Sequence, residues 1–304
     1  MRRRLFLPAA LCLAACVPAL AAGATTLAGT VDTRVADVPG DADVVSELLS
    51  FDGTRHSLVP ADAAAADQLH AVSGMPARVT MAADGTVTAA APAPGLAPAA
   101  APKAMTLLAV IITPAGTTQE VTQAELSGRL FTDSGSVAAY LNAQAPAGLS
   151  LTGTVVGPYA TPANPSCDED ALLADARSAL SANGVSTTGY THLMVSFPDP
   201  NATCGWSGLA SVGGPYSWIT DGSAPKVLAH ELGHNIGLYH ANSLACSAGG
   251  TPVAFSAVAK CTPTEYGDTF STMGRGTGTP GPTFSAQDRE ALGWMGDPGF
   301  AGRP

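Results

Sequence analysis

Residues 230–240 read HELGHNIGLYH, and this stretch decides how the rest of the chain is interpreted. A helix that begins at Ser223, with Pro225 in its first turn, would place His230 and His234 on one face, about 6 Å apart along the axis. Two imidazoles in that arrangement can bind one zinc ion. Three of the six histidines of the chain fall in this stretch, so ordinary helix-face histidines explain the pattern poorly.

The residues between the histidines complete the predicted site. Glu231 is about 100° round the helix from His230, beside the metal, which suits a general base that acts on water. Gly237 adopts a left-handed conformation without steric cost, so we expect the helix to end there and the chain to turn. The turn would bring back His240 as a third ligand. Three histidines leave a fourth position open for water, as a catalytic zinc site requires.

The stretch resembles the extended H-E-x-x-H-x-x-G-x-x-H signature of the metzincin zinc metallopeptidases. Members carry a methionine-containing turn beneath the metal, and Met273, in Ser271-Thr272-Met273-Gly274, fits that role 33 residues after His240. Within the metzincins the chain is similar to the gametolysin-like family. The similar phrases are HELGHNIGLYHA, EYGDTFSTMG at 265–274 and FSAQDREALGWM at 284–295, with further similarity at 136–159 and 208–219.

The resemblance covers about residues 104–296. It implies an α/β (α+β) domain with a twisted mixed sheet, an active-site helix and a Met-turn, and it implies cleavage of peptide bonds in extracellular or wall-associated proteins. Two departures limit it. Some metzincins have a tyrosine two positions after the Met-turn methionine, where this chain has Arg275, and we expect Tyr266 to hydrogen-bond within its own loop. The region after the predicted signal also has no cysteine that could silence the zinc before residue 104.

We expect an extended peptide substrate to pair with an edge strand at Gly208, Leu209 and Ala210, with Glu231 moving the proton from water to the leaving amine. Two other functions stay open. One is a degenerate protease domain that serves as a surface-binding module, and the other is a zinc hydrolase that acts on a non-peptide bond.

The N-terminus is typical of an export signal over residues 1–21. Arg2, Arg3 and Arg4 precede an apolar run, and Ala19-Leu20-Ala21 offers a cleavage site. Leu13-Ala14-Ala15-Cys16 also resembles a lipobox, so the alternatives are a secreted or periplasmic protein and a lipoprotein tethered through Cys16. Loss of the three arginines changes the formal charge from −10 to −13, which argues against nucleic acid and anionic membranes as partners. No transmembrane helix is expected in the mature chain.

Two units are expected after the signal. Residues 22–88 predict a small β-rich domain, with a helix at 61–72 and a hairpin at 77–88 that turns at Asp84-Gly85. This domain is either a removed pro-segment or a retained accessory domain. Residues 89–103 have the Ala/Pro-rich composition of a linker.

Residues 104–304 form the predicted catalytic unit. Its predicted strands are 106–113, 149–156 and 191–197, with an extended run at 209–219. Its predicted helices begin after Ser134 or Ser136 and at Asp168.

Four cysteines remain once Cys12 and Cys16 are assigned to the signal. In an exported chain they suggest two disulfides, and we expect the pairs adjacent in sequence, Cys167–Cys204 and Cys246–Cys261. Asp199, Asp221 and Asp268 could help to hold calcium, but no calcium-loop spacing supports this.

Overall fold

A computed structural model of the protein describes residues 24–38, 41–50, 53–93, 104–145, 149–164, 167–199, 203–220, 224–254, 258–275 and 283–295. The predicted signal with Cys16, most of the predicted linker, Ser223 and Asp221 lie outside these ranges.

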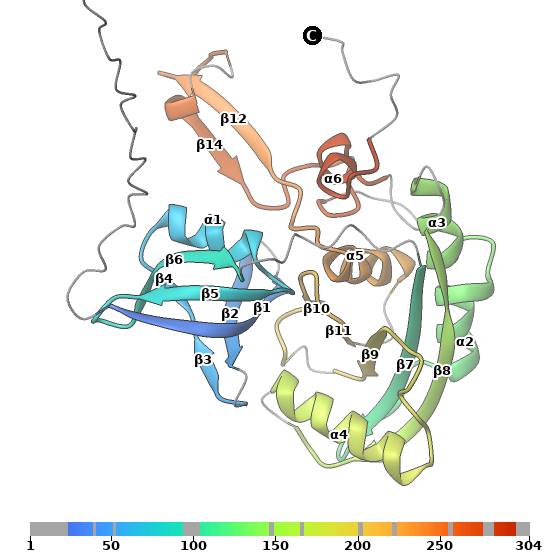
Figure 1. Cartoon of the computed structure of the whole chain (residues 1–304). Coiled ribbons are helices and arrows are strands. Elements are labelled where there is room, and N and C mark those ends of the chain that lie inside the picture. Colours follow the sequence, from blue (N-terminus) through green and yellow to red (C-terminus); the bar gives the residue numbers. More distant parts are fainter. Residues whose placement is uncertain are drawn as a thin grey trace, which may run out of the picture.

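Within the described residues, one mixed sheet of 11 strands runs through the molecule (Figure 1). Its strands are β1 (Thr25–Val38), β2 (Asp41–Ser50), β3 (Arg55–Ser57), β4 (Val59–Pro60), β5 (Pro76–Met81), β6 (Thr86–Pro92), β7 (Ala104–Pro114), β8 (Ser150–Thr161), β9 (His192–Phe197), β10 (Gly208–Ser211) and β11 (Tyr216–Thr220). The order is β4-β6-β5-β1-β10-β11-β9-β7-β8, and β2 joins β1 and β3.

The half of the sheet from β11 to β8 is parallel and is covered on both faces. Alternate residues of β7 enter two cores, which explains its unbroken apolar sequence. One core holds Leu107 with residues of α2 (Gln123–Ser127), α3 (Val137–Gln144) and α5 (Pro225–Asn235). The other holds Leu108 with α4 (Glu169–Ala182), on the opposite face of the sheet (Figure 1). Asp168 caps α4 as expected, and Ser136 caps α3.

The N-terminal region, residues 24–93, is β-rich as predicted and has its own small core around Val31, Leu48 and Val79. Its helix α1 (Ala63–Ala71) is capped by Asp62. Its strands belong to the same sheet as the rest of the molecule, because β1 pairs with β5 along its first half and with β10 near its end. The predicted start of the linker needs correction, because β6 continues to Pro92 and residues 89–92 pair with β5.

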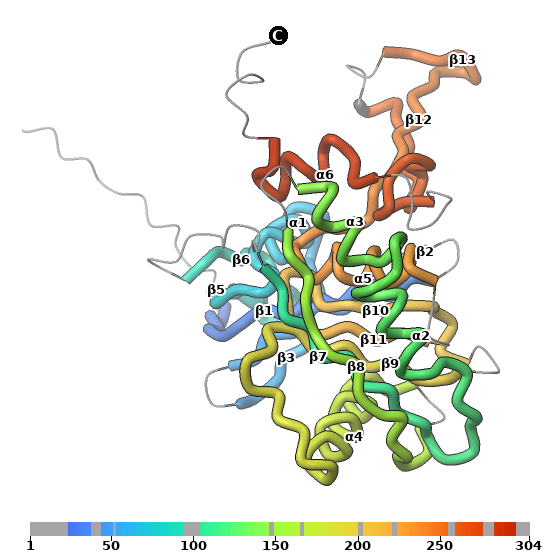
Figure 2. The backbone as a smooth tube through the Cα atoms, turned by 90° about the vertical axis from the view of Figure 1, so that its right-hand side faces the viewer, coloured from blue at the N-terminus to red at the C-terminus, as the bar shows by residue number. Residues whose placement is uncertain are grey.

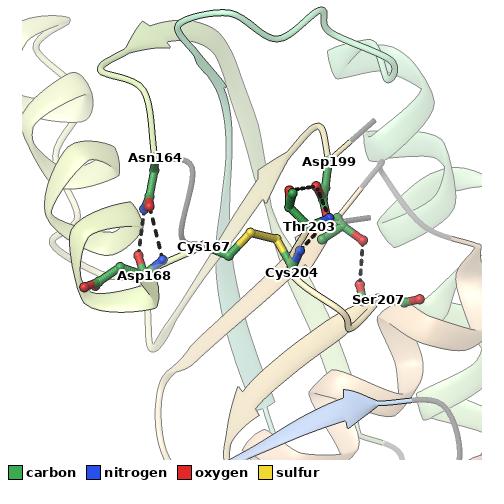
Figure 3. Close-up of a disulfide and its surroundings, with 8 residues drawn as sticks. Asn164, Cys167, Asp168, Asp199, Thr203, Cys204 and Ser207 are labelled. Carbon is green, nitrogen blue, oxygen red and sulfur yellow. Dashed lines mark hydrogen bonds between the residues drawn. A yellow bond between two sulfur atoms is a disulfide. The ribbon is translucent and has the colours of Figure 1, made fainter. Parts of the chain in front are cut away.

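The C-terminal part contains elements that the sequence did not predict. Strands β12 (Ser243–Ala248), β13 (Thr251–Pro252) and β14 (Cys261–Thr264) form a small sheet that projects from the body (Figure 2), and α6 (Ala286–Ala291) follows. The structure joins Cys246 to Cys261 across β12 and β14, and Cys167 to Cys204 beside the start of α4 (Figure 3). These are the expected pairs. None of the helices in the described ranges has the length and apolarity to cross a membrane.

Candidate metal centre

Helix α5 carries the first two histidines. It begins at Pro225 with Ala224 as its N-cap, and no side chain forms a cap hydrogen bond. Ser223, which the sequence predicted as the cap, lies outside the described residues. The helix ends as predicted before Gly237, whose φ is +105°. The amides of Gly237 and Leu238 donate to the carbonyls of His234 and Gly233 at 2.8 and 3.0 Å. This pair of bonds is the Schellman ending, and it turns the chain back toward the helix.

Each of the three histidines is held through Nδ1 by its own oxygen. His230 contacts the carbonyl of Thr272 at 2.8 Å, and His234 contacts the carbonyl of Leu238 at 2.7 Å. His240 contacts Oε1 of Glu265 at 2.7 Å. Because these oxygens are acceptors, we assign the proton of each neutral ring to Nδ1. Each Nε2 then has a free lone pair, and outer contacts of this kind fix the orientation of metal-binding histidines.

The three Nε2 atoms converge on one point together with Asp37 at the end of β1. Asp37 Oδ1 lies 3.2 Å from His230 Nε2 and 3.1 Å from His240 Nε2, and the Nε2 atoms of His234 and His240 are 3.2 Å apart. A tetrahedral zinc ion with bonds of about 2.0 Å requires neighbouring ligands about 3.3 Å apart. Four acceptors that face one another also need a cation between them. The residues present therefore fit a zinc ion.

Glu231 lies beside this centre and is completely buried. Its carboxyl lies next to that of Asp37, and neither of its oxygens has another hydrogen-bond partner among the described residues. It packs against β10, where a Cβ atom at Gly208 would lie 2.0 Å from Oε1 of Glu231. Burial, together with the charge of Asp37, raises the pKa of Glu231 well above its ordinary value. Burial also acts to raise the pKa of Asp37, but with no metal bound the positive charge of protonated His230 and the hydrogen bonds from His230 and His240 outweigh burial and lower that pKa well below its usual range.

Met273 lies beneath the helix, where the sequence placed the Met-turn. It is fully buried, and a Cβ atom at Gly233 would lie 2.4 Å from its sulfur. The carbonyl of the preceding residue, Thr272, accepts from His230, and the carbonyl of Met273 accepts from the amide of Ala241 at 2.8 Å. The turn thus supports both α5 and the segment that returns to His240.

Tyr266 lies at the centre and not, as expected, within its own loop. Its hydroxyl donates to Oδ1 of Asp37 at 2.6 Å, and its ring centroid is 3.8 Å from that of His240. The backbone at Tyr266 has a φ of +54°, which turns the ring toward the histidines. Burial and the charge of Asp37 raise the pKa of Tyr266, so its hydroxyl stays a donor. Arg275, at the position of the tyrosine in some metzincins, is exposed and donates its amide to the carbonyl of Tyr266.

Sequence reasoning missed Asp37, Glu265 and Tyr266. Each belongs to a residue type that is common in loops and strands, and none stands at a diagnostic spacing from the histidines. Asp37 precedes His240 by 203 residues. The pattern EYGD, which includes Glu265 and Tyr266, is part of the family resemblance, but the resemblance gave neither residue a role at the metal centre.

The strand expected to bind a peptide, β10, has no open edge in this structure. Its residues Gly208, Leu209 and Ala210 are buried. On one side they pair with β11, and on the other with β1, where Val35 faces Ala210 and Ala36 faces Leu209. The expectation of an open edge strand is therefore wrong while β1 is paired with β10.

The aspartates considered for calcium have structural partners instead. Asp199 accepts from the amides of Thr203 and Cys204 at 2.9 Å, next to the disulfide (Figure 3). Asp268 accepts from the amides of Phe270 and Ser271 at 2.7 and 3.1 Å. Both side chains thus stabilise loops, which explains them without calcium.

Comparison with family models finds no match, and comparison with curated proteins finds none either. Among solved structures, the archaemetzincin from Methanopyrus kandleri has a TM-score of 0.36 and 13% identity, over 63% of this chain and 94% of that chain. A structure of a chaperone–substrate complex has a TM-score of 0.32 and 15% identity, over 64% of this chain and 32% of that chain. At these scores neither likeness establishes a function, and the case rests on the geometry of the centre.

Proposed function

We propose that this chain is an exported zinc-dependent endopeptidase. The observation that carries the proposal is the convergence of three histidine Nε2 atoms and Asp37 on one point, with the buried carboxyl of Glu231 beside them. Zinc is the metal that a cluster of imidazoles with one carboxylate suits best at tetrahedral spacing.

The proposed roles follow from the contacts. When bound by these residues, zinc supplies a Lewis acid that polarises a carbonyl oxygen and lowers the pKa of water. Glu231 takes a proton from the attacking water and passes it to the leaving amine. We assign the Tyr266 hydroxyl to the carbonyl oxygen of the substrate, because it already donates to an oxygen, Oδ1 of Asp37, at that position.

Glu231 favours an enzyme over a zinc-containing binding module. A carboxyl that is fully buried beside a second carboxyl, that of Asp37, costs folding free energy, and a purely structural zinc site has no use for it. Such groups cluster at catalytic sites. A peptide substrate is supported by β10, whose backbone pairs with an extended strand in this structure.

Export is supported by the N-terminal sequence and by the two disulfides, which persist in oxidising compartments. We propose secretion or release to the periplasm, with extracellular or wall-associated proteins as substrates. Mass spectrometry of the mature N-terminus tests this. A free Ala22 or Gly23 supports release, and a lipidated Cys16 would instead show tethering.

Hydrolysis of a pool of quenched peptides tests the activity. The zinc-loaded chain is compared with Glu231→Gln, before and after cleavage at a protease site placed within residues 94–103. We expect cleavage by the parent sequence alone, with one zinc in both proteins. If neither protein cleaves a peptide in either form while each holds one zinc, the peptidase proposal is wrong and a binding module becomes the better explanation.

A further inference from the structure

The end of β1 lies where a peptide substrate would have to lie. From Arg34 to Ala36, β1 is antiparallel to β10, with Arg34 facing Ser211 and Ala36 facing Leu209. The amide of Val212 also donates to the carbonyl of Thr33 at 2.8 Å. Because β11 occupies the other edge of β10, β1 takes the remaining edge.

The same register brings Asp37 to the metal centre. It is one residue beyond Ala36, which faces Leu209, and the neighbouring residue of β10, Gly208, packs against Glu231. The carboxyl oxygen of Asp37 contacts His230, His240 and the hydroxyl of Tyr266, and its side chain is only 16% exposed. With β1 paired along β10, a substrate backbone cannot pair there, and with Asp37 against the histidines a water molecule cannot occupy the fourth position.

We propose that β1 is an internal inhibitor, in which Thr33–Ala36 fill the peptide-binding edge of β10 and Asp37 is the fourth ligand of the metal. This inference rests on the proposed function and adds its regulation. Withdrawal of β1 opens the edge of Leu209 and Ala210 to an extended peptide that runs antiparallel to β10.

The contacts that hold β1 in place are non-covalent. The Arg34 side chain, 5% exposed, bonds to Asp32 and Glu169 at 3.1 Å and to Asp170 at 3.0 Å, at the start of α4. It also lies over the ring of Trp218, with 5.5 Å between its Cζ and the ring centroid. These charges attract at close range but weaken with salt.

A second set of contacts joins α1 to the turn after α5 and the residues after α1 to the end of β10. The ring of His70 stacks on Tyr239 with 4.5 Å between centroids, and the hydroxyl of Ser73 donates to the carbonyl of Val212 at 2.6 Å. Residues 22–103 contain no cysteine, so no disulfide ties this region to the rest. A cut between residues 94 and 103 would leave β1 held only by these reversible contacts.

A permanent four-ligand zinc site is the competing explanation of Asp37. Closed sites of that kind are structural, whereas catalytic sites keep a position for water. The position of Glu231 separates the two, because a closed structural site gives no reason to bury a second carboxyl next to that of Asp37. Asp37 is also the one member of the cluster that comes from outside residues 104–295.

The test uses the full chain loaded with zinc or Co²⁺, as the parent and as Asp37→Ala. Asp67→Ala is the matched control, because Asp67 is an exposed aspartate of the same region that lies on α1. Asp37→Ala should cleave quenched peptides at least about tenfold faster than the parent, since the fraction of open sites sets the rate. Its Co²⁺ absorption spectrum should also change with the loss of a carboxylate ligand. Asp67→Ala should match the parent in both measurements.

The outcomes separate the two proposals. Equal cleavage by parent and Asp37→Ala would overturn the inhibitor and leave the peptidase standing. An unchanged Co²⁺ spectrum in Asp37→Ala would show that Asp37 is not a ligand. If Asp37→Ala does not fold, Arg34→Met, which leaves every ligand in place, should still raise cleavage, and no rise would contradict the inference. If no variant and no cut chain cleaves a peptide, the proposed function fails and the inhibitor fails with it.

Discussion

The metal centre has two sides that are held in different ways. On one side, His230, His234 and His240 come from 11 consecutive residues, and each ring is fixed by an oxygen of a residue between 238 and 272. On the other side, Asp37 arrives from β1, and its position depends on strand pairing and on the charges around Arg34. The histidines are positioned by helix α5 and the turn that follows it, whereas Asp37 is positioned by the pairing of β1 with β10.

This difference teaches that the four ligands need not be equal in use. Ligands whose orientation is set by a helix, a Schellman turn and close hydrogen bonds stay in place when β1 leaves. A ligand that is held by a strand edge and an ion cluster can be withdrawn.

Removal of a fixed ligand should have the largest effect. His240→Ala should lose zinc on dialysis under conditions that leave the parent loaded, and cleavage should fall to background, because two histidines and a removable carboxylate do not hold the metal. Zinc content by elemental analysis and peptide cleavage are the measurements. His56→Ala, on β3 away from the centre, is the control. Full zinc content and activity in His240→Ala would show that His240 is not a ligand.

A methyl group at the contact between β10 and α5 should leave zinc bound and slow catalysis. In Gly208→Ala the added Cβ would stand 2.0 Å from Oε1 of Glu231. Displacement of a catalytic group by about 1 Å costs on the order of 100-fold in rate, so kcat/KM should fall by about that factor. Gly135→Ala, with open space around its Cβ, should have no effect. Unchanged kinetics in Gly208→Ala would contradict the assignment of Glu231 as the base.

The Glu265 carboxylate that contacts Nδ1 of His240 should affect the affinity of the centre for zinc. Glu265→Gln replaces the carboxylate that accepts from Nδ1 of His240, and such changes typically weaken metal binding by about 10- to 100-fold. Competition with a chelator measures the change, and Glu290→Gln, at an exposed position, is the control. A zinc affinity equal to that of the parent would mean that this contact does not orient His240.

The smallest effect is expected from the charged side chains around Arg34, and it should appear in the free energy of unfolding. Arg34→Met removes several charge-assisted hydrogen bonds from a buried side chain and should lower the free energy of unfolding of the metal-free chain by about 2 kcal/mol. Arg55→Met removes a half-exposed partner of the same cluster and should cost less than about 1 kcal/mol. Denaturant titration measures both. Equal losses in the two variants would show that burial of Arg34 adds nothing to the docking of β1.

The sequence predicted the parts of this site that local spacing controls. The two histidines of α5, Glu231 and the turn at Gly237 follow from the period of a helix and from the conformation open to glycine. The apolar run of β7 likewise identified a strand buried on both faces.

The missing parts depend on pairing between distant segments. Nothing in the sequence of residues 25–38 indicates that the end of this strand pairs with β10. The register of an antiparallel pair is set by the packed sheet and not by either strand alone. Asp37 and Tyr266 become recognisable as residues of the metal centre only once β1 is paired with β10. The small sheet of β12, β13 and β14 was missed for a related reason, because its short polar strands carry no alternating pattern.

The decisive measurement is peptide cleavage by Asp37→Ala beside the double variant Asp37→Ala/Glu231→Gln. Both proteins keep the three histidines and should hold one zinc. The account predicts that Asp37→Ala cleaves peptides and that the double variant does not. Equal cleavage by both proteins would contradict it, because the reaction would then not depend on Glu231.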